Sequence, residues 1–217
     1  MPLTVGAVTC RSYMITDPPS RDFLAEGIRD VQRHAFRPPQ VERGQTRSLG
    51  WVNARNLLDA RLTAEKMMFE DFLVLGLRID RVALNGRVVK AHLNEAVREV
   101  LKDRRKQGIG REERAALLDK VKLELLAKQT PGTTVYEMAW NTKTHRVYFS
   151  ATSDSLNSEF CDLFSDTFHA ALRPLFPFLR AETKAKKEHT TEALLESLPA
   201  RFSPHAVKET PAAEAGD

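Results

Sequence analysis

The chain has 217 residues, of which 42% are hydrophobic and 29% are charged. These values are those of a soluble globular protein, and no run approaches the roughly 20 apolar residues that a membrane-spanning helix needs. The net charge is +4 and the isoelectric point is near 9.1, which favours an anionic partner.

The two cysteines, Cys10 and Cys161, are too few and too far apart for a disulfide framework or a thiolate metal site. The N-terminal sequence lacks the basic and long apolar segments of a signal peptide. We therefore expect a cytosolic protein of bacterial type with reduced thiols. The length suits one domain or two small ones.

The first third of the chain predicts strands around one helix. Residues 3–13 have the apolar and β-branched content of a strand, and Asp17-Pro18-Pro19 ends it. Ser20 is placed to cap a helix that runs to Phe36 and keeps one apolar face. Further strands are expected at 49–53 and within 67–79.

The segment from Arg78 to Arg114 carries most of the positive charge. It contains eleven Lys/Arg and six Asp/Glu, a net of +5, whereas residues 1–180 together carry +6. Gly108-Ile109-Gly110 interrupts the helical pattern of this region. The segment therefore predicts two helices, at 89–107 and 111–129.

The first of these helices sorts its charges by sign. At about 100° per residue, its apolar residues form one face, with cations along one flank and carboxylates along the other. Solvated helices more often mix signs at i,i+4, which gains a few tenths of a kcal/mol per pair. Sorting forgoes this gain and produces a positive stripe suited to a polyanion, although an ordinary solvated face is the alternative. The cations are Arg98, Lys102 and Arg105, and the carboxylates are Glu95, Glu99 and Asp103.

Thr130-Pro131-Gly132 separates this segment from the C-terminal part of the chain. Strands are predicted at 135–140 and 146–152, joined by a turn over 141–144. Ser153, Asp154 and Ser155 offer caps for a helix that Pro174 and Pro177 end. The apolar residues of this helix recur at helical spacing and predict a buried face. They are Leu156, Phe160, Leu163, Phe164, Phe168, Ala171 and Leu172.

The predicted order of elements is βαββ–αα–ββα, with strands and helices partly segregated. This order favours an α+β fold with mixed or antiparallel sheets packed against helices. We expect residues 1–182 to form one α+β region that contains the basic two-helix segment 78–129. Residues 183–217 are expected to be a polar, largely disordered tail with a short helix at 191–198.

Motifs for catalysis are mostly absent. The sequence has no Gly-x-x-x-x-Gly-Lys phosphate loop, no Gly-x-Ser-x-Gly elbow and no His or Cys spacing suited to zinc. A metal-dependent nuclease needs converging carboxylates, often with a nearby lysine. Glu182-Thr183-Lys184 lies in the predicted tail, and Asp71 and Asp80 have no recognisable partners. We therefore expect no catalytic residues, no metal site and no cofactor.

The positive segment does not resemble a module that recognises base sequence. Helix-turn-helix spacing, zinc-finger spacing and leucine heptads are all missing. The aromatic residues lie mainly in apolar faces, which argues against a platform for stacking single-stranded bases. The pattern instead favours a largely sequence-independent attraction to DNA phosphates.

Short segments spread along the chain resemble a known family, and their order and spacing together are specific. They are Phe23-Leu24-Ala25-Glu26-Gly27, Ala35-Phe36-Arg37-Pro38, Gly50-Trp51-Val52, Leu77-Arg78-Ile79-Asp80, Val88-Val89-Lys90, Arg111-Glu112-Glu113-Arg114, Leu125-Leu126, Ser150-Ala151-Thr152-Ser153, Phe160-Cys161-Asp162-Leu163-Phe164 and Leu175-Phe176-Pro177. On these segments, roughly residues 1–182 resemble the bacterial recombination-associated protein family RdgC.

The resemblance implies a cytoplasmic, nucleoid-associated protein that binds duplex DNA with little sequence preference. It also implies ring-shaped homodimers with a positively lined hole, and restraint of the RecA recombinase. A Pro-, Ala- and Glu-rich tail replaces the family's C-terminal portion, so we expect a C-terminally shortened member. Leu84-Asn85-Gly86 stands where the family has a Pro-containing turn, so the start of the following helix is expected to differ.

The leading hypothesis is a non-enzymatic, sequence-independent DNA-binding protein that modulates recombination. Two alternatives stay open: a metal-dependent exonuclease of recombination or repair, and a protein-interaction module that uses the acidic flank of the sorted helix. The residues expected to contact phosphates are Arg78, Arg81, Arg87, Lys90, Arg98, Lys102, Arg105, Lys106 and Arg111.

Overall fold

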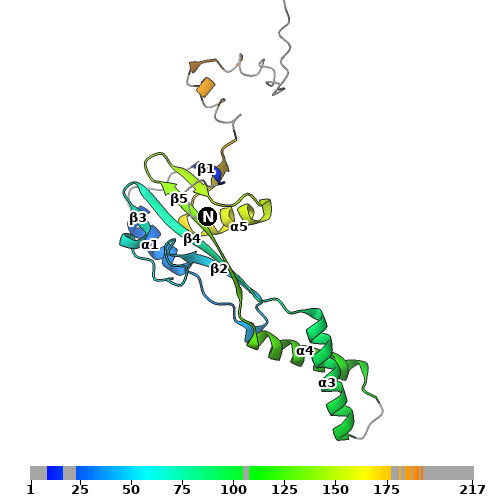
Figure 1. The fold of residues 1–217 in the computed structure, drawn as a ribbon. Helices are drawn as coiled ribbons and strands as arrows, with labels where there is room; N and C mark the ends of the chain where they lie inside the picture. The colour runs from blue at the N-terminus through cyan, green and yellow to red at the C-terminus, as the bar shows by residue number, and fades with distance from the viewer. Residues whose placement is uncertain are drawn as a thin grey trace, which may run out of the picture. The chain divides into compact units, whose positions relative to one another are not determined.

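The computed structural model describes residues 9–16, 23–104, 108–176, 181, 184–186, 188–190 and 192 (Figure 1). The helices are α1 (Phe23–Arg33), the 3-10 helix η1 (Val41–Arg43), α2 (Ala64–Met67), α3 (Gly86–Arg104), α4 (Arg111–Lys128) and α5 (Asp154–Phe168). The strands are β1 (Arg11–Ile15), β2 (Arg47–Val52), β3 (Met68–Phe69), β4 (Phe72–Arg81), β5 (Gly132–Asn141), β6 (Arg146–Phe149) and β7 (Leu172–Pro174).

The strands of the described residues form one antiparallel sheet in the order β2-β4-β5-β6-β1-β7, and β3 also pairs with β4. Strand β4 pairs with β2, β3 and β5. Its pairing with β5 runs along its whole length, from Phe72–Asn141 to Arg81–Gly132. The predicted α+β class and the order βαββ–αα–ββα are confirmed. The short elements η1, α2, β3 and β7 are additions that the sequence did not predict.

Helices α1 and α5 pack on one face of this sheet (Figure 1). Alternate residues of β4, including Leu75 and Leu77, point to that face, as the period of two in a strand requires. They meet Phe160 and Phe164 of α5, and both rings are fully buried. This aromatic-rich layer is the main core of the protein.

The predicted buried face of α5 is confirmed over its first four turns, since Leu156, Phe160, Phe164 and Phe168 are buried. The predicted end of the helix is wrong. Helix α5 stops at Phe168, because His169 adopts a left-handed conformation with φ of 52° and caps it. Leu172 therefore belongs to β7, which pairs with β1.

Helices α3 and α4 form a hairpin inserted between the neighbouring strands β4 and β5 (Figure 1). Arg81 and Gly132 are directly paired at the end where the chain leaves and re-enters the sheet. Both ends of the insertion are therefore held by one antiparallel pair. The contacts between α3 and α4, and between α4 and η1, support the hairpin further.

The chain divides into two compact units, Met1–Leu175 and Phe176–Asp217. In the second unit, residues 181, 184–186, 188 and 192 are helical, and Lys184 pairs with Glu188 at 3.8 Å. Most of the predicted tail and of its short helix at 191–198 lies outside the described residues. So do residues 3–8 of the first predicted strand and the predicted cap Ser20.

Candidate nucleic-acid interface

Helix α3 begins with a side-chain cap. The side-chain oxygen of Asn85 accepts a hydrogen bond from the backbone N–H of Arg87 at 2.9 Å. The backbone carbonyl of Asn85 also accepts the first helical bond, from Val89 at 3.0 Å. This is the geometry of an N-cap, which satisfies a donor that the first turn leaves free. The Leu84-Asn85-Gly86 segment thus starts the helix without a proline.

The hairpin has a small apolar interface of its own. Val89 and Leu93 of α3 are buried, as are Val121 and Leu126 of α4. These residues are not part of the main core formed by the sheet, α1 and α5. The packing leaves the polar flanks of α3 in solvent.

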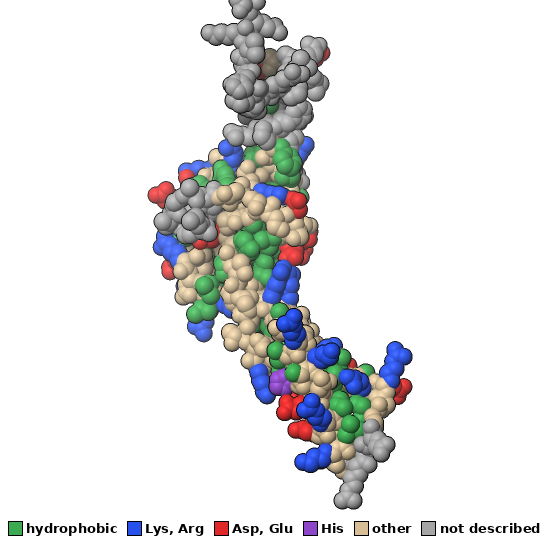
Figure 2. Space-filling view, turned by 45° about the vertical axis from the view of Figure 1, so that its right-hand side comes forward, with side chains coloured by type: hydrophobic (Ala, Val, Ile, Leu, Met, Phe, Trp, Pro, Cys, Tyr) green, Lys and Arg blue, Asp and Glu red, His purple; other side chains and the backbone are tan. Residues whose placement is uncertain are grey.

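The charges of α3 lie on two separate flanks of the helix. At 100° per residue, Arg87, Lys90, Arg98 and Lys102 fall within an arc of about 120°, and all four side chains are exposed. We call these four residues the positive flank. Glu95, Glu99 and Asp103, also exposed, form the acidic flank on the other side. Figure 2 shows Lys and Arg side chains along the hairpin, with Asp and Glu side chains at separate places on its sides.

The charges of α4 are arranged differently. Lys120 pairs with Glu124 at 3.9 Å and Lys122 pairs with Asp119 at 3.8 Å, the i,i+4 and i,i+3 spacings of ordinary solvated helices. Within the described part of the chain, no residue of the positive flank lies within ion-pair distance of a carboxylate. The two helices of the hairpin therefore differ: the four cations of the positive flank have no ion pair among the described residues, whereas two lysines of α4 pair with carboxylates of the same helix.

Arg81 and Arg111 are also exposed, whereas Arg105 and Lys106 lie outside the described residues. Arg78 differs from the others, because its side chain is only 14% exposed and bonds Asp80 through two nitrogens at 2.8 and 2.7 Å. Its guanidinium carbon lies 4.2 Å from the ring centroid of Phe36. We therefore remove Arg78 from the set of phosphate contacts and assign it to the folded framework.

Asn94 is a residue of this flank that the charge pattern did not identify. At 100° per residue, it falls between Lys90 and Arg98, and its side chain is exposed. An amide can both donate and accept hydrogen bonds, so Asn94 can contact a phosphate or a sugar. The helical periodicity of the sequence would have been enough to assign Asn94 to the positive flank.

A family model described as "Putative exonuclease, RdgC" matches residues 12–211 of this chain. The chain belongs to the RdgC family. At the level of the family, it is a recombination-associated DNA-binding protein. The match confirms the resemblance and continues past residue 182 into the segment predicted to be a tail. A search among curated proteins finds no match.

The RdgC description names an exonuclease. A metal-dependent nuclease needs carboxylates that can hold a metal ion, so the positions of the Asp and Glu side chains are relevant to that activity. Among the described residues, no group of three or more His, Cys, Asp or Glu could hold a metal ion. Asp71 and Asp80, expected to lack partners, both have one. Lys143 lies 2.8 Å from Asp71, while Arg78 bonds Asp80.

The described helices include none long and apolar enough to cross a membrane.

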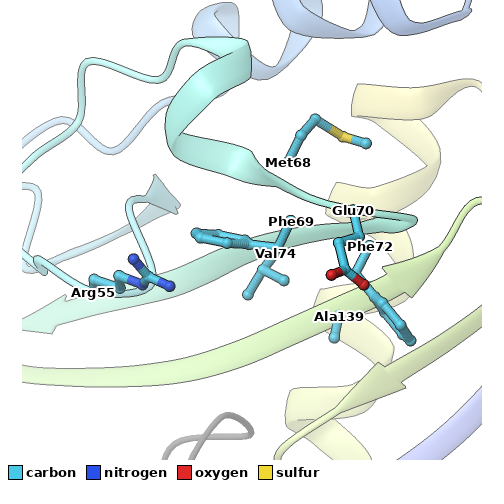
Figure 3. Close-up of a pocket in the computed structure, with 7 residues that line it drawn as sticks. All are labelled: Arg55, Met68, Phe69, Glu70, Phe72, Val74 and Ala139. Atoms are coloured by element: carbon cyan, nitrogen blue, oxygen red, sulfur yellow. The ribbon is translucent and has the colours of Figure 1, made fainter.

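A cavity of about 670 Å³ lies beside the β3–β4 turn (Figure 3). The guanidinium carbon of Arg55 lies 4.2 Å from the ring centroid of Phe69, and Glu70 supplies the carboxylate of the lining. This mostly apolar lining does not provide the converging carboxylates that metal-dependent cleavage uses. The cavity is lined by Arg55, Met68, Phe69, Glu70, Phe72, Val74 and Ala139.

Proposed function

We propose that this RdgC-family protein binds duplex DNA through the positive flank of α3, by phosphate contacts that do not depend on base sequence. The observation that carries the proposal is the separation of charge on α3, beside an α4 in which Lys120 and Lys122 pair with carboxylates of the same helix. The proposed contacts are Arg81, Arg87, Lys90, Arg98, Lys102 and Arg111, together with Arg105 and Lys106.

The length of the positive flank suits a DNA backbone. From Arg87 to Lys102 the helix rises about 22 Å at 1.5 Å per residue. A DNA strand places a phosphate about every 3.4 Å along its axis, so this length faces on the order of six phosphates. Long, flexible cationic side chains can each reach one of them without contacting a base. We therefore expect binding that does not depend on base sequence.

Binding of this kind restrains recombination by occupying the duplex. A RecA-type recombinase must reach the DNA, and a protein that covers phosphates regardless of sequence limits its access. We place this action at the nucleoid in the cytoplasm. A homodimer would apply two positive flanks to one duplex, as two-fold symmetry allows. The proposed activity is binding, with no chemical step.

The test is the salt dependence of DNA affinity, measured by fluorescence anisotropy on a labelled duplex. If the positive flank neutralises four phosphates, log K falls against log [salt] with a slope near −3.6. That slope corresponds to about a hundredfold loss of affinity between 50 and 200 mM salt. If both positive flanks of a dimer contact the duplex, the slope is twice as steep. A slope near zero, or a strong preference between two unrelated sequences, contradicts the proposal.

DNA cleavage is a second candidate, because the family description names an exonuclease. End-labelled duplex is incubated with the protein and Mg²⁺ or Mn²⁺. Under the binding proposal, the label stays in full-length strands. Cleavage that requires metal, rises with protein dose and survives repurification would instead establish the enzyme.

A further inference from the structure

A small polar pocket lies where β4 leaves the sheet toward the hairpin. Its volume is about 250 Å³, which is below the roughly 300–1,000 Å³ of sites for drug-sized ligands. It therefore suits a small chemical group. We call it the Arg81 pocket, and its lining residues are Ile79, Arg81, Thr134, Tyr136, Ser153, Ser155, Leu156 and Glu159.

The strand register explains why these side chains meet. Ile79 and Arg81 are two apart on β4, so they point to the same face of the sheet. Thr134 is paired directly with Ile79, and Tyr136 follows two residues later on the same face of β5. The first turn of α5 packs over this face and contributes Ser155. Residues from three elements thus line one small space.

An unusual pairing of like charges borders the pocket. Arg47 of β2 lies directly opposite Arg81 of β4, and like charges at such positions repel each other. Arg47 is neutralised by an ion pair with Glu159 of α5. No carboxylate lies within ion-pair distance of Arg81 in the part of the chain that the structure describes. One uncompensated guanidinium is therefore held at the pocket.

The other carboxylate at the start of α5 is also neutralised. Arg11 donates hydrogen bonds to Asp154 and to the carbonyl of Thr152, both at 2.6 Å. The acidic groups around the pocket are thus both paired with arginines, and Arg81 leaves a local charge of about +1. This balance favours an anion over a cation.

Hydroxyl groups add further donors. Among the described residues, the hydroxyls of Thr134 and Tyr136 have no hydrogen-bond partner, while Ser155 contacts Ser153 at 3.2 Å between oxygens. A hydroxyl can donate one hydrogen bond, and a guanidinium presents five N–H groups. The lining therefore offers more donors than the protein accepts.

We propose that the Arg81 pocket binds a phosphate group. A phosphate presents several acceptor oxygens and negative charge, and a guanidinium binds it with two parallel hydrogen bonds. The phosphate belongs either to DNA or to a free phosphate-bearing molecule. The DNA source rests on the function proposed above. It is supported by the position of Arg81, which is at most about 20 Å of extended chain from Arg87 of the positive flank. In that case the pocket continues the positive flank onto the sheet.

The DNA arm compares Arg81→Gln with Arg173→Gln, a matched change at an exposed arginine of β7 on the far edge of the sheet. Removing one phosphate contact is expected to lower affinity about fivefold to tenfold at 0.1 M salt and to reduce the salt slope by about 0.9. Arg173→Gln is expected to change affinity less than twofold, because salt screens distant charges. Arg81→Lys retains the charge, so it is expected to keep the slope while lowering affinity.

A second variant removes donors without changing charge. Tyr136→Phe combined with Ser155→Ala is expected to weaken phosphate binding at an unchanged salt slope, since no cation is removed. Thermal melting checks that each variant is folded. Tyr136→Phe retains the ring, whose centroid lies 6.0 Å from that of Phe149.

The free-phosphate arm titrates inorganic phosphate into the protein and follows backbone amide shifts by NMR, with chloride as the control. Saturable shifts at Thr134 and Ser155 that Arg81→Gln abolishes support the pocket. If these shifts occur while DNA affinity is unchanged in Arg81→Gln, the phosphate comes from a free molecule.

The inference is overturned if phosphate gives no saturable shifts and Arg81→Gln binds DNA like Arg173→Gln. This failure is distinct from failure of the proposed function. The positive flank of α3 can still bind DNA without the pocket, which variants confined to α3 would show. Loss of all DNA binding in the native protein would instead contradict the proposed function and leave the phosphate titration as the test of the pocket.

Discussion

Arg78 and Asp80 form an ion pair within β4. Asp80 is 3% exposed at its side chain and also accepts a hydrogen bond from Thr133 at 2.8 Å. Removing one partner of a buried pair leaves the other charge uncompensated. We expect Asp80→Asn to lower the free energy of unfolding by about 3 kcal/mol, measured by urea denaturation. The matched control is Asp71→Asn, whose pair with Lys143 is exposed, so it should change stability by less than about 0.5 kcal/mol. Equal changes would contradict this assignment.

The same pair predicts a pH dependence. The hydrogen bonds from Arg78, with a further one from Thr133, hold the pKa of Asp80 below its usual value. A carboxyl whose pKa is lower in the folded state contributes stability above its unfolded pKa, near 3.9, and loses it as pH falls through the folded value. We therefore expect the stability difference between the native protein and Asp80→Asn to be smaller at pH 3 than at pH 7. A difference that is equal at both pH values would contradict this assignment.

Gly50 occupies a position where the neighbouring backbone leaves no room for a side chain. A Cβ added there would lie 2.5 Å from the Cα of Phe36, because residues 34–36 bond to the edge of β2. Gly50→Ala is expected to destabilise the protein by about 1–3 kcal/mol or more, as overpacking does. Gly86→Ala is the control, since nothing lies within 4 Å of its added Cβ at the start of α3. Thermal melting should show the first variant destabilised and the second unchanged or more stable.

At the scale of the element, α3 makes two predictions of opposite sign. Replacing Lys90, Arg98 and Lys102 with Gln should preserve the fold, because Gln retains most of the helix propensity. DNA affinity should fall, and the salt slope should shrink by up to about 0.9 for each phosphate that is no longer neutralised. Anisotropy titrations at several salt concentrations measure both quantities.

The matched variant replaces the acidic flank, Glu95, Glu99 and Asp103, with Gln or Asn. Its DNA affinity should be equal to that of the native protein or higher, because repulsion from phosphates is reduced. Equal and opposite responses from the two variants would mean that only net charge matters. A loss of affinity in the acidic-flank variant would contradict the assignment of DNA to the positive flank.

At the scale of the whole molecule, the proposal includes a homodimer on DNA. Light scattering with and without a short duplex is expected to give a protein mass of twice the 24.5 kDa chain in the complex. A single chain per duplex, at protein concentrations well above the dissociation constant, would contradict the homodimer. It would leave phosphate binding by one positive flank intact.

The elements with strong periodicity could be predicted from the sequence. The apolar stripe of α5, the two helices around Gly108-Ile109-Gly110 and the sorted charges of α3 all follow from residues a few positions apart. Their period reflects the geometry of the helix itself. The predicted start of α3 at residue 89 was three residues too late, because the prediction did not use Asn85 as the N-cap. The family resemblance was visible in the order of short segments.

The contacts between distant segments were decided by the tertiary structure. Arg78 belongs to the framework because β4 turns it toward Asp80 and Phe36, although their spacing of two in a strand was a signal that the charge count obscured. The Arg81 pocket depends on the register between β4 and β5 and on α5, whose Glu159 pairs with Arg47 far away in the sequence. The sequence alone determined the long helices and strands and where positive charge gathers, because those are properties of neighbouring residues. Only the fold determined that Arg47 pairs with Glu159 and Arg11 with Asp154, because strand register and helix packing bring together partners that are more than a hundred residues apart.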